Sequence, residues 1–207
     1  MPNQTLPTIG DRLSDKGVSW AWHSGGWNDA LAGRPDPLFQ FHHQPFIFFA
    51  KYADGTEAKR VDLKDEKDFL SAVAEGSLPG VSFVKPLGPD NEHPGYASLF
   101  RGQEHVADLV SRIRVSSLWN DSIIIITCDE NGGRWDHVSP PVVDRWGPGT
   151  RVPTIVISPF ARQATIDHTQ YDTTSILKLI ETRWDLQPLG SRSRDAAAGN
   201  LLNALSF

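Results

Sequence analysis

An acidic pair, Asp129–Glu130, is followed within a few residues by the glycine pair Gly132–Gly133 and then by Asp136 and His137. Carboxylate oxygens and imidazole nitrogens are the side-chain atoms that bind Mg, Ca, Mn or Zn ions in proteins. The two glycines allow a tight turn and a close approach of the backbone to a ligand. This combination predicts a site that binds a divalent cation beside an anionic substrate. The alternative is a turn at the end of a strand, with solvated acidic side chains.

The acidic pair directly follows an apolar run, Ser122–Cys128 (SIIIITC). An unbroken, β-branched run without alternation is typical of a strand that is buried on both faces of a parallel sheet. Open α/β sheets place their ligand-binding crevice at the carboxyl ends of such strands. We therefore expect Asp129 and Glu130 at the end of a central strand.

Two histidines follow other predicted strands. His23 stands in HSGGWN after the alternating run Val18–Trp22, and His93 stands in NEHPG, in the polar loop after Val81–Val84. By itself, His23 is equally consistent with a satisfied surface histidine. The adjacent pair His42–His43 is not expected to bind a metal ion, because neighbouring residues rarely face one site.

The rest of the pattern alternates helices and strands. Helices are predicted at Thr8–Lys16, Leu63–Glu75, Ser98–Trp119 and Thr173–Trp184, and a further strand is predicted at Arg151–Ser158. The proline- and phenylalanine-rich segment 33–60 shows no clean period, so we expect it to be irregular. The order strand, helix, strand between Val81 and Cys128 predicts a βαβ unit in a parallel sheet. We interpret residues 1–207 as a single domain.

Composition narrows the functional classes. The 207 residues carry a formal net charge of −5, which gives no electrostatic case for binding nucleic acid or an anionic membrane. No apolar run is long enough for a transmembrane segment, and the first residues show no signal peptide. The single cysteine, Cys128, excludes an intramolecular disulfide and is interpreted as a small core residue.

Several segments together resemble one known family. These segments are GDRLSDKGVSWAWHSGGWN, NEHPGY, CDENGGRWDHVSPP, RWGPGTRVPTIVISPFAR and DHTQYDTTSILKLIETRW. They are similar to the C-terminal part of the bacterial phosphoesterase family that contains the secreted acid phosphatases and the phosphatidylcholine-type phospholipases C. The resemblance covers nearly the whole chain, and DENGGxWDHVxPP is its most specific piece. The runs DRWGPGT and YDTTSIL resemble the acid phosphatase branch more than the phospholipases.

The resemblance implies an α/β fold, an alkaline-phosphatase-like three-layer sandwich with a mostly parallel sheet, of which this chain would form an incomplete half. It implies metal-dependent hydrolysis of phosphate monoesters, with a divalent metal ion as cofactor. Asp129 and Glu130 match the metal-ligand pair of the family. His23 and His93 match histidines that hold or protonate the phosphate, and His137 matches the histidine of the DHV motif. Protonated histidines would fit an acid pH optimum.

Family members begin with a segment of the type ENxSFDHxFG, which supplies further metal ligands, and carry the hydroxyl nucleophile after it. We find neither in this chain, so we expect that part to be missing and assign no nucleophile among Ser24, Ser139 and Ser158. The alternatives to a monoesterase are a phospholipase C-like phosphodiesterase and a non-catalytic remnant that binds metal or phosphate.

The resemblance also leads to expectations about partners and location. The substrate would be a phosphate ester, and the partner an N-terminal half of the enzyme. Without that half, an unpaired sheet edge or apolar face would favour self-association of the chain. By the same resemblance we expect the protein in the periplasm or outside the cell.

Overall fold

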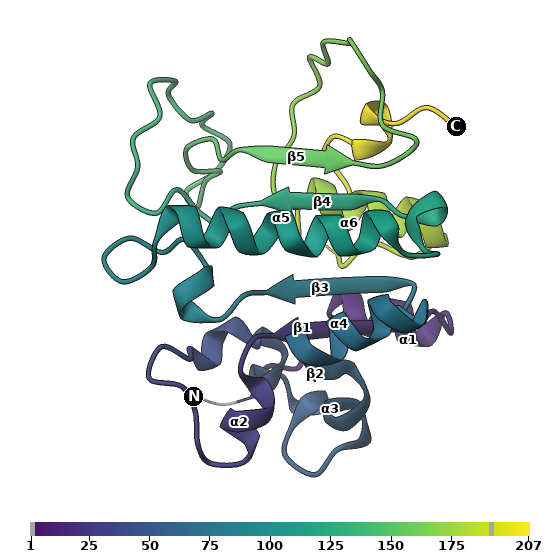
Figure 1. Cartoon of the computed structure of the whole chain (residues 1–207). Coiled ribbons are helices and arrows are strands. Elements are labelled where there is room, and N and C mark those ends of the chain that lie inside the picture. Colours follow the sequence, from purple (N-terminus) through teal and green to yellow (C-terminus); the bar gives the residue numbers. More distant parts are fainter. Residues whose placement is uncertain (1–2, 191–192) are drawn as a thin grey trace. The chain divides into compact units, whose positions relative to one another are not determined.

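The computed structural model describes residues 3–190 and 193–207, and it divides into two compact units (Figure 1). Unit 1 runs from Met1 to Leu118, and unit 2 runs from Trp119 to Phe207. Each unit has its own sheet. The expectation of a single domain over residues 1–207 stays a prediction. Among the described residues, every helix is too short or too polar to cross a lipid bilayer.

Unit 1 contains a small parallel sheet surrounded by helices. Its elements are α1 (Ile9–Asp15), β1 (Trp20–Ser24), α2 (Trp27–Leu31), η1 (Phe41–His43), η2 (Pro45–Phe48), η3 (Ala50–Tyr52), α3 (Glu57–Asp62), β2 (Leu63–Asp65), α4 (Glu66–Glu75), β3 (Val81–Lys85), η4 (Gly88–Asp90) and α5 (Leu99–Val115). The strand order is β2-β1-β3, and both pairings of β1 are parallel. The carboxyl ends of the three strands therefore lie at one edge of this sheet.

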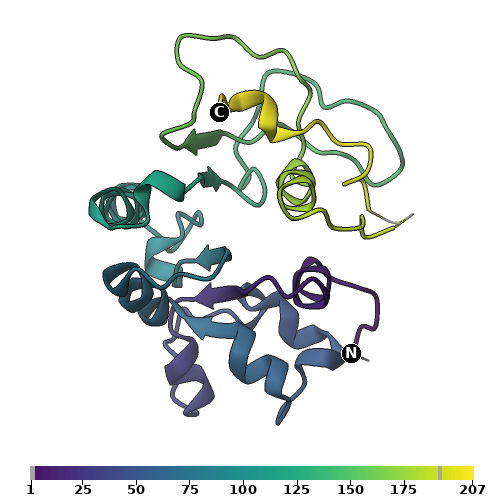
Figure 2. The ribbon, with the colours of Figure 1, turned by 90° about the vertical axis from the view of Figure 1, so that its right-hand side faces the viewer.

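The two faces of the sheet are covered by different elements (Figure 2). Successive side chains of a strand point to opposite faces. On one face, Trp20 of β1 donates a hydrogen bond from its indole nitrogen to Ser14 of α1 (3.0 Å) and contacts the ring of Phe46 at 4.8 Å between centroids. On the other face, the ring of His23 contacts Phe69 of α4 at 5.4 Å between centroids. The sheet of unit 1 is thus the middle of three layers.

The segment predicted to be irregular, residues 33–60, forms much of this cover. Two of its 3-10 turns, η2 and η3, bury Phe46 and Tyr52 against Trp20, and Tyr52 is fully buried. Burying aromatic rings of this size supplies a large share of core stabilisation in a small unit. The segment was predicted correctly as lacking long regular elements, although its end contributes the short helix α3.

Unit 2 contains η5 (Trp119–Asp121), β4 (Ile124–Thr127), β5 (Thr154–Ile157), α6 (Ser175–Trp184) and η6 (Leu201–Ala204). Its core is formed by Leu179, Leu201 and Leu205. Partly buried residues pack against these leucines: Ile123, Ile125, Val156, Phe160, Tyr171, Ile176 and Leu202. The C-terminal segment therefore completes the core under the β4–β5 pair.

The prediction of β4 as a parallel strand buried on both faces is wrong in two respects. β4 pairs with β5 in an antiparallel ladder in which Ile124 lies opposite Ile157, and the residues of β4 are half-buried. β3 belongs to the sheet of unit 1 and β4 to the sheet of unit 2, so the βαβ unit predicted across them stays a prediction. The α/β class itself is confirmed, because helices flank a parallel sheet in unit 1.

Candidate functional site

His23 is buried at the end of β1, with 2% of its surface exposed. Its Nδ1 lies 3.2 Å from the carbonyl oxygen of Phe83 on the neighbouring strand. A carbonyl oxygen only accepts hydrogen bonds, so Nδ1 must carry a hydrogen that it donates. Burial lowers the pKa of the imidazole, and the bond to Phe83 only partly offsets this effect. The ring is therefore held in its neutral form at neutral pH, with the proton on Nδ1. It is not the surface histidine of the simplest interpretation.

The turn after His23 is held by the junction between β2 and α4. The backbone N–H of Asn28 donates to Oδ2 of Asp65 at 2.8 Å, while Oδ1 of Asp65 accepts from Lys67 and caps α4. Gly26 has a φ of +80°, which favours glycine, and a Cβ added at Gly25 would lie 2.5 Å from the backbone nitrogen of Leu87. The two glycines are therefore required by the backbone and by close packing.

His93 lies in the loop after β3 and is exposed. Its ring stacks on that of Tyr96 with 4.5 Å between centroids and 13° between planes, and its Nδ1 lies 2.7 Å from the carbonyl oxygen of Pro94. Asn91 accepts a hydrogen bond from the backbone of His93 and donates another to the hydroxyl of Tyr96. These contacts fix the ring and leave its Nε2 to interact with a ligand. When the ring is protonated, Nε2 can donate a hydrogen bond to that ligand.

Asp129 and Glu130 are exposed and directly follow β4 and Cys128, as the sequence predicted. Glu130 Oε2 accepts a hydrogen bond of 2.8 Å from the backbone of Gly132. Gly132 and Gly133 have φ values of +60° and +74°, so the turn depends on both glycines. The pair of carboxylates is thus presented on a tight turn at the end of a strand.

His137 is exposed and lies in the same loop, next to an ion pair that closes it. Arg151 donates to both oxygens of Asp136, at 2.8 Å from Nε and 2.9 Å from Nη2. This pairing holds the pKa of Asp136 well below its usual range. Asp136 therefore stays ionised and serves as an anchor for the loop, whereas His137 has a freely accessible surface.

The structure places the predicted residues in two groups. His23 lies in β1, one residue before its end, and His93 follows β3; these neighbouring parallel strands of unit 1 pair at their ends through Ser24 and Lys85. Asp129, Glu130 and His137 share one loop of unit 2. Across residues 3–190 and 193–207, no cluster gathers three or more His, Cys, Asp or Glu side chains in a metal-binding arrangement. The two carboxylates of unit 2 suit a hard cation chemically, but they supply only part of a coordination shell.

None of the serines considered as nucleophiles gains support. Ser24 is 1% exposed. Ser158 donates to the carbonyl oxygen of Ser122 at 2.9 Å and accepts from the backbone of Phe160, so its hydroxyl holds the end of β5. Ser139 is exposed in the loop after His137, without a basic partner among the contacts of the described residues. We therefore assign no nucleophile.

The adjacent histidines His42 and His43 lie in the 3-10 turn η1. In the 3-10 turn η1 the two rings meet edge to face, with 4.6 Å between their centroids and 80° between their planes. His43 is buried, and its carbonyl oxygen accepts a hydrogen bond of 2.7 Å from the indole of Trp22. The two imidazoles therefore contact each other, one exposed and one buried, and the expectation that they do not bind a metal ion stays a prediction.

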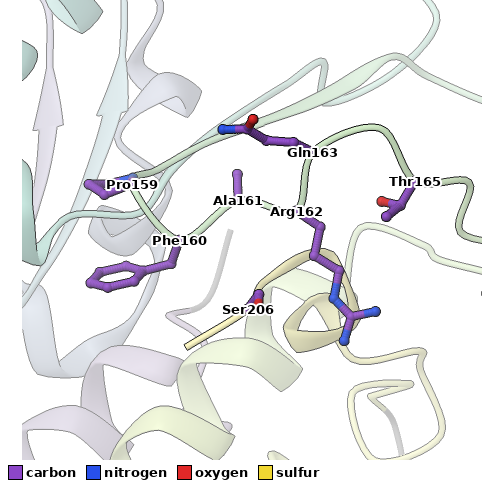
Figure 3. A pocket seen from close by; sticks show the side chains of 7 residues that line it. All are labelled: Pro159, Phe160, Ala161, Arg162, Gln163, Thr165 and Ser206. Atoms are coloured by element: carbon purple, nitrogen blue, oxygen red, sulfur yellow. The ribbon is translucent and has the colours of Figure 1, made fainter.

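A shallow hollow of about 460 Å³ lies after β5 in unit 2 (Figure 3). The residues that line it are Pro159, Phe160, Ala161, Arg162, Gln163, Thr165 and Ser206. Arg162 is held there by its Nε, which donates to the carbonyl oxygen of Leu205 at 2.8 Å. The hollow contains none of the predicted site residues, so it is separate from the carboxylate loop.

Unit 1 is an α/β unit in which polar segments lie at the carboxyl ends of parallel strands, the edge at which proteins of this class bind ligands. The chain belongs to the phosphoesterase family, whose model matches residues 1–187. The parallel sheet and its flanking helices agree with the alkaline-phosphatase-like fold that the sequence resemblance implies.

Three relatives illustrate the match. Phospholipase C B of Mycobacterium tuberculosis is 29% identical over 230 residues, which cover 95% of this chain and 42% of the relative. Non-specific phospholipase C6 of Arabidopsis thaliana is 30% identical over 176 residues, covering 70% of this chain and 33% of the relative. Non-hemolytic phospholipase C of Pseudomonas aeruginosa is 24% identical over 246 residues, covering 98% of this chain and 33% of the relative. The chain thus spans less than half the length of each, between 33% and 42%.

Proposed function

We propose that this chain is part of an enzyme that hydrolyses phosphate esters, with Asp129 and Glu130 as ligands of a divalent metal ion. One observation carries the proposal: a chain of the phosphoesterase family presents two exposed carboxylates on a glycine turn at the end of β4. Carboxylate oxygens are the preferred ligands of hard cations. A bound cation would supply polarisation of the phosphoryl oxygens and activation of the nucleophile.

The remaining ligands would have to come from residues beyond this carboxylate pair. The family resemblance implies that an N-terminal segment supplies them together with the nucleophile. The limited coverage of the relatives, 42% of phospholipase C B, is consistent with a larger catalytic protein. We therefore expect full activity to require that additional part, provided as a separate chain or as a longer polypeptide.

Among the histidines, His93 is the best-supported hydrogen-bond donor to the phosphate group of a substrate. Its ring is exposed and fixed by Tyr96, so a protonated Nε2 can donate to an oxygen that gains charge in the transition state. His137 is accessible in the carboxylate loop and is the second candidate. For His23, burial and a lowered pKa support a neutral, positioning role, and contact with phosphate would require the turn after β1 to open.

The substrate class has two candidates, and different observations support them. Relatives whose names state phospholipase C activity cover up to 98% of this chain, which supports a phosphodiester of the phospholipid type. The runs DRWGPGT and YDTTSIL resemble the acid phosphatase branch, which supports a monoester. We place the diester first because the relatives match nearly the whole chain, whereas each run is short.

The test compares p-nitrophenyl phosphorylcholine with p-nitrophenyl phosphate, from about pH 5 to pH 8, with and without Mn²⁺, Mg²⁺, Ca²⁺ or Zn²⁺. Calorimetric titration of the same ions measures metal binding. Asp129→Ala should lose metal binding and any hydrolysis, whereas Asp121→Ala, an exposed acid in η5, should retain both. Faster cleavage of the monoester would reverse the order of the two substrates.

Absence of hydrolysis with metal binding retained would show that the chain needs the additional part. The proposal would be refuted by a folded chain that neither binds any of these ions nor hydrolyses either ester. It would also be refuted if Asp129→Ala behaved like Asp121→Ala.

A further inference from the structure

The first turns of α5 hold the loop that carries His93. Arg101 pairs with Asp90 at 2.5 Å from Nε and 3.3 Å from Nη2. A Cβ added at Gly102 would lie 2.3 Å from Cγ of Glu92 and 3.1 Å from the carbonyl oxygen of Asp90. Glu92 has a φ of +63°, which is uncommon for a residue other than glycine. The absence of a side chain at Gly102 therefore lets Glu92 pack directly against the helix, immediately before His93.

One turn further along α5, a second pair reaches another element. Nε2 of His105 lies 2.5 Å from Oε1 of Glu66, the first residue of α4. Glu66 is buried, with 7% of its surface exposed, and His105 is half-buried. The hydrogen bond to Glu66 raises the pKa of His105. A charged hydrogen bond of this kind is about twice as strong as a neutral one.

The other oxygen of Glu66 faces the turn that follows His23. A Cβ added at Gly25 would lie 3.0 Å from Oε2 of Glu66, so the carboxylate is in close contact with the turn. A Cβ at the same position would also lie 2.5 Å from the backbone nitrogen of Leu87, and the N–H of Gly25 donates to the carbonyl oxygen of Lys85 at 3.0 Å. The turn is therefore packed against both Glu66 and the segment leading to His93.

We propose that His105 and Glu66 are positioning residues, which fix the turn Gly25–Gly26 and, through α5, couple it to the loop of His93. A single helix then holds both loops that follow the parallel strands β1 and β3. Neither residue contacts substrate in this proposal. Its relevance to catalysis rests on the proposed function of His93, whereas the coupling itself is a property of unit 1.

The test is ¹H–¹⁵N NMR on the whole chain, with the amides of Gly25 and Gly26 and the imidazoles of His93 and His105 as probes. In the unsubstituted chain, the two amides should titrate together with His105, at a midpoint above the ordinary histidine value of about 6.5. The buried His23 is distinguishable because its pKa is lowered. Besides Glu66, the charged groups near His105 are Asp90 and Asp108.

His105→Leu should shift both glycine amides and the imidazole signals of His93, and should speed hydrogen exchange at Gly25 by about tenfold. His105→Gln can still donate to Glu66 without a charge, so it should keep the amide positions but remove their pH dependence. Ile113→Val, at a buried site on the same helix, controls for general loss of stability. Asp108→Asn controls for a change of charge on α5.

Unchanged glycine amides and an unchanged His93 in His105→Leu would overturn the proposal, since the pair would then only attach α5 to α4. The coupling would also be refuted if Ile113→Val moved these signals as far as His105→Leu does. Failure of the proposed function is a separate result. A chain without hydrolysis or metal binding, in which the amides still follow His105, would retain the coupling and lose the phosphoesterase assignment.

Discussion

Replacing Asp65 by alanine should destabilise unit 1 more than the loss of a helix N-cap alone does. Asp65 is 1% exposed and is the last residue of β2, and its two carboxylate oxygens accept hydrogen bonds from two different segments. Oδ1 caps α4 through Lys67 at 3.0 Å, and Oδ2 accepts the backbone N–H of Asn28 at 2.8 Å. Alanine removes both interactions with one substitution.

The magnitude follows from these two bonds. Loss of an N-cap costs about 1 kcal/mol. Loss of a hydrogen bond to a charged acceptor costs roughly 1.5 kcal/mol when one end lies near solvent, as Asn28 does. The sum is about 2.5 kcal/mol of the free energy of unfolding. Asp65→Asn has one carbonyl oxygen left, so it can retain only one of the two bonds and should lose roughly half as much.

The assay is the urea dependence of hydrogen exchange at the amides of β1, which reports on unit 1 alone. Thr56→Ala is the matched control, because Thr56 caps α3 through Lys59 at 3.2 Å and has no second acceptor role between elements. It should cost about 1 kcal/mol. If Asp65→Ala costs no more than Thr56→Ala, the bond to Asn28 contributes nothing and the reasoning fails.

Two further predictions concern the histidine-bearing loops. Burial lowers the pKa of His23, so below about pH 6.5 the unfolded chain binds a proton that the folded chain does not. Stability should therefore fall as the pH falls through that value. His23→Phe should flatten this slope, which denaturation curves at several pH values would measure. Gly102→Ala should destabilise the chain by about 1–3 kcal/mol because the new Cβ would overlap Glu92, although glycine to alanine normally favours a helix. Urea titration measures this cost, with Gln103→Ala, at an exposed site on α5, as the control. A gain in stability for Gly102→Ala would contradict the packing.

The sequence predicted the elements whose apolar pattern is long and whose ends are marked. α6 was predicted over Thr173–Trp184 and observed over Ser175–Trp184. The predicted end of a helix at Glu75 is confirmed, since α4 ends there and Gly76 forms a left-handed C-cap with a φ of +68°. Such signals are local, so they can be recognised without knowledge of the tertiary structure.

Pairing between distant segments could not be predicted in the same way. Leu63–Asp65 was assigned to a helix but forms β2, because it pairs with Trp22–Ser24 about forty residues earlier in the chain. The run before Cys128 was correctly identified as a strand, but an apolar run does not specify the direction of its partner. The antiparallel pairing with β5 depends on the long loop 128–153, which turns the chain back.

The burial of the candidate histidines could not be predicted from residue type either. His23 and His93 both follow a strand in a polar, glycine-containing segment. Only the tertiary structure places one under Phe69 and the other on the surface beside Tyr96. The acidic pair was placed correctly at a strand end, because the strand and the turn glycines adjoin it in sequence.

The core of unit 2 bears on where the chain can be shortened for expression. The family match ends at residue 187, but Leu201 and Leu205 lie beyond it and are 5% and 3% exposed. Trimming to that boundary would uncover Ile125 and its neighbours beneath the β4–β5 pair, and such trimmed chains would be prone to aggregate. An affinity tag is better attached after Phe207, whose side chain is 82% exposed.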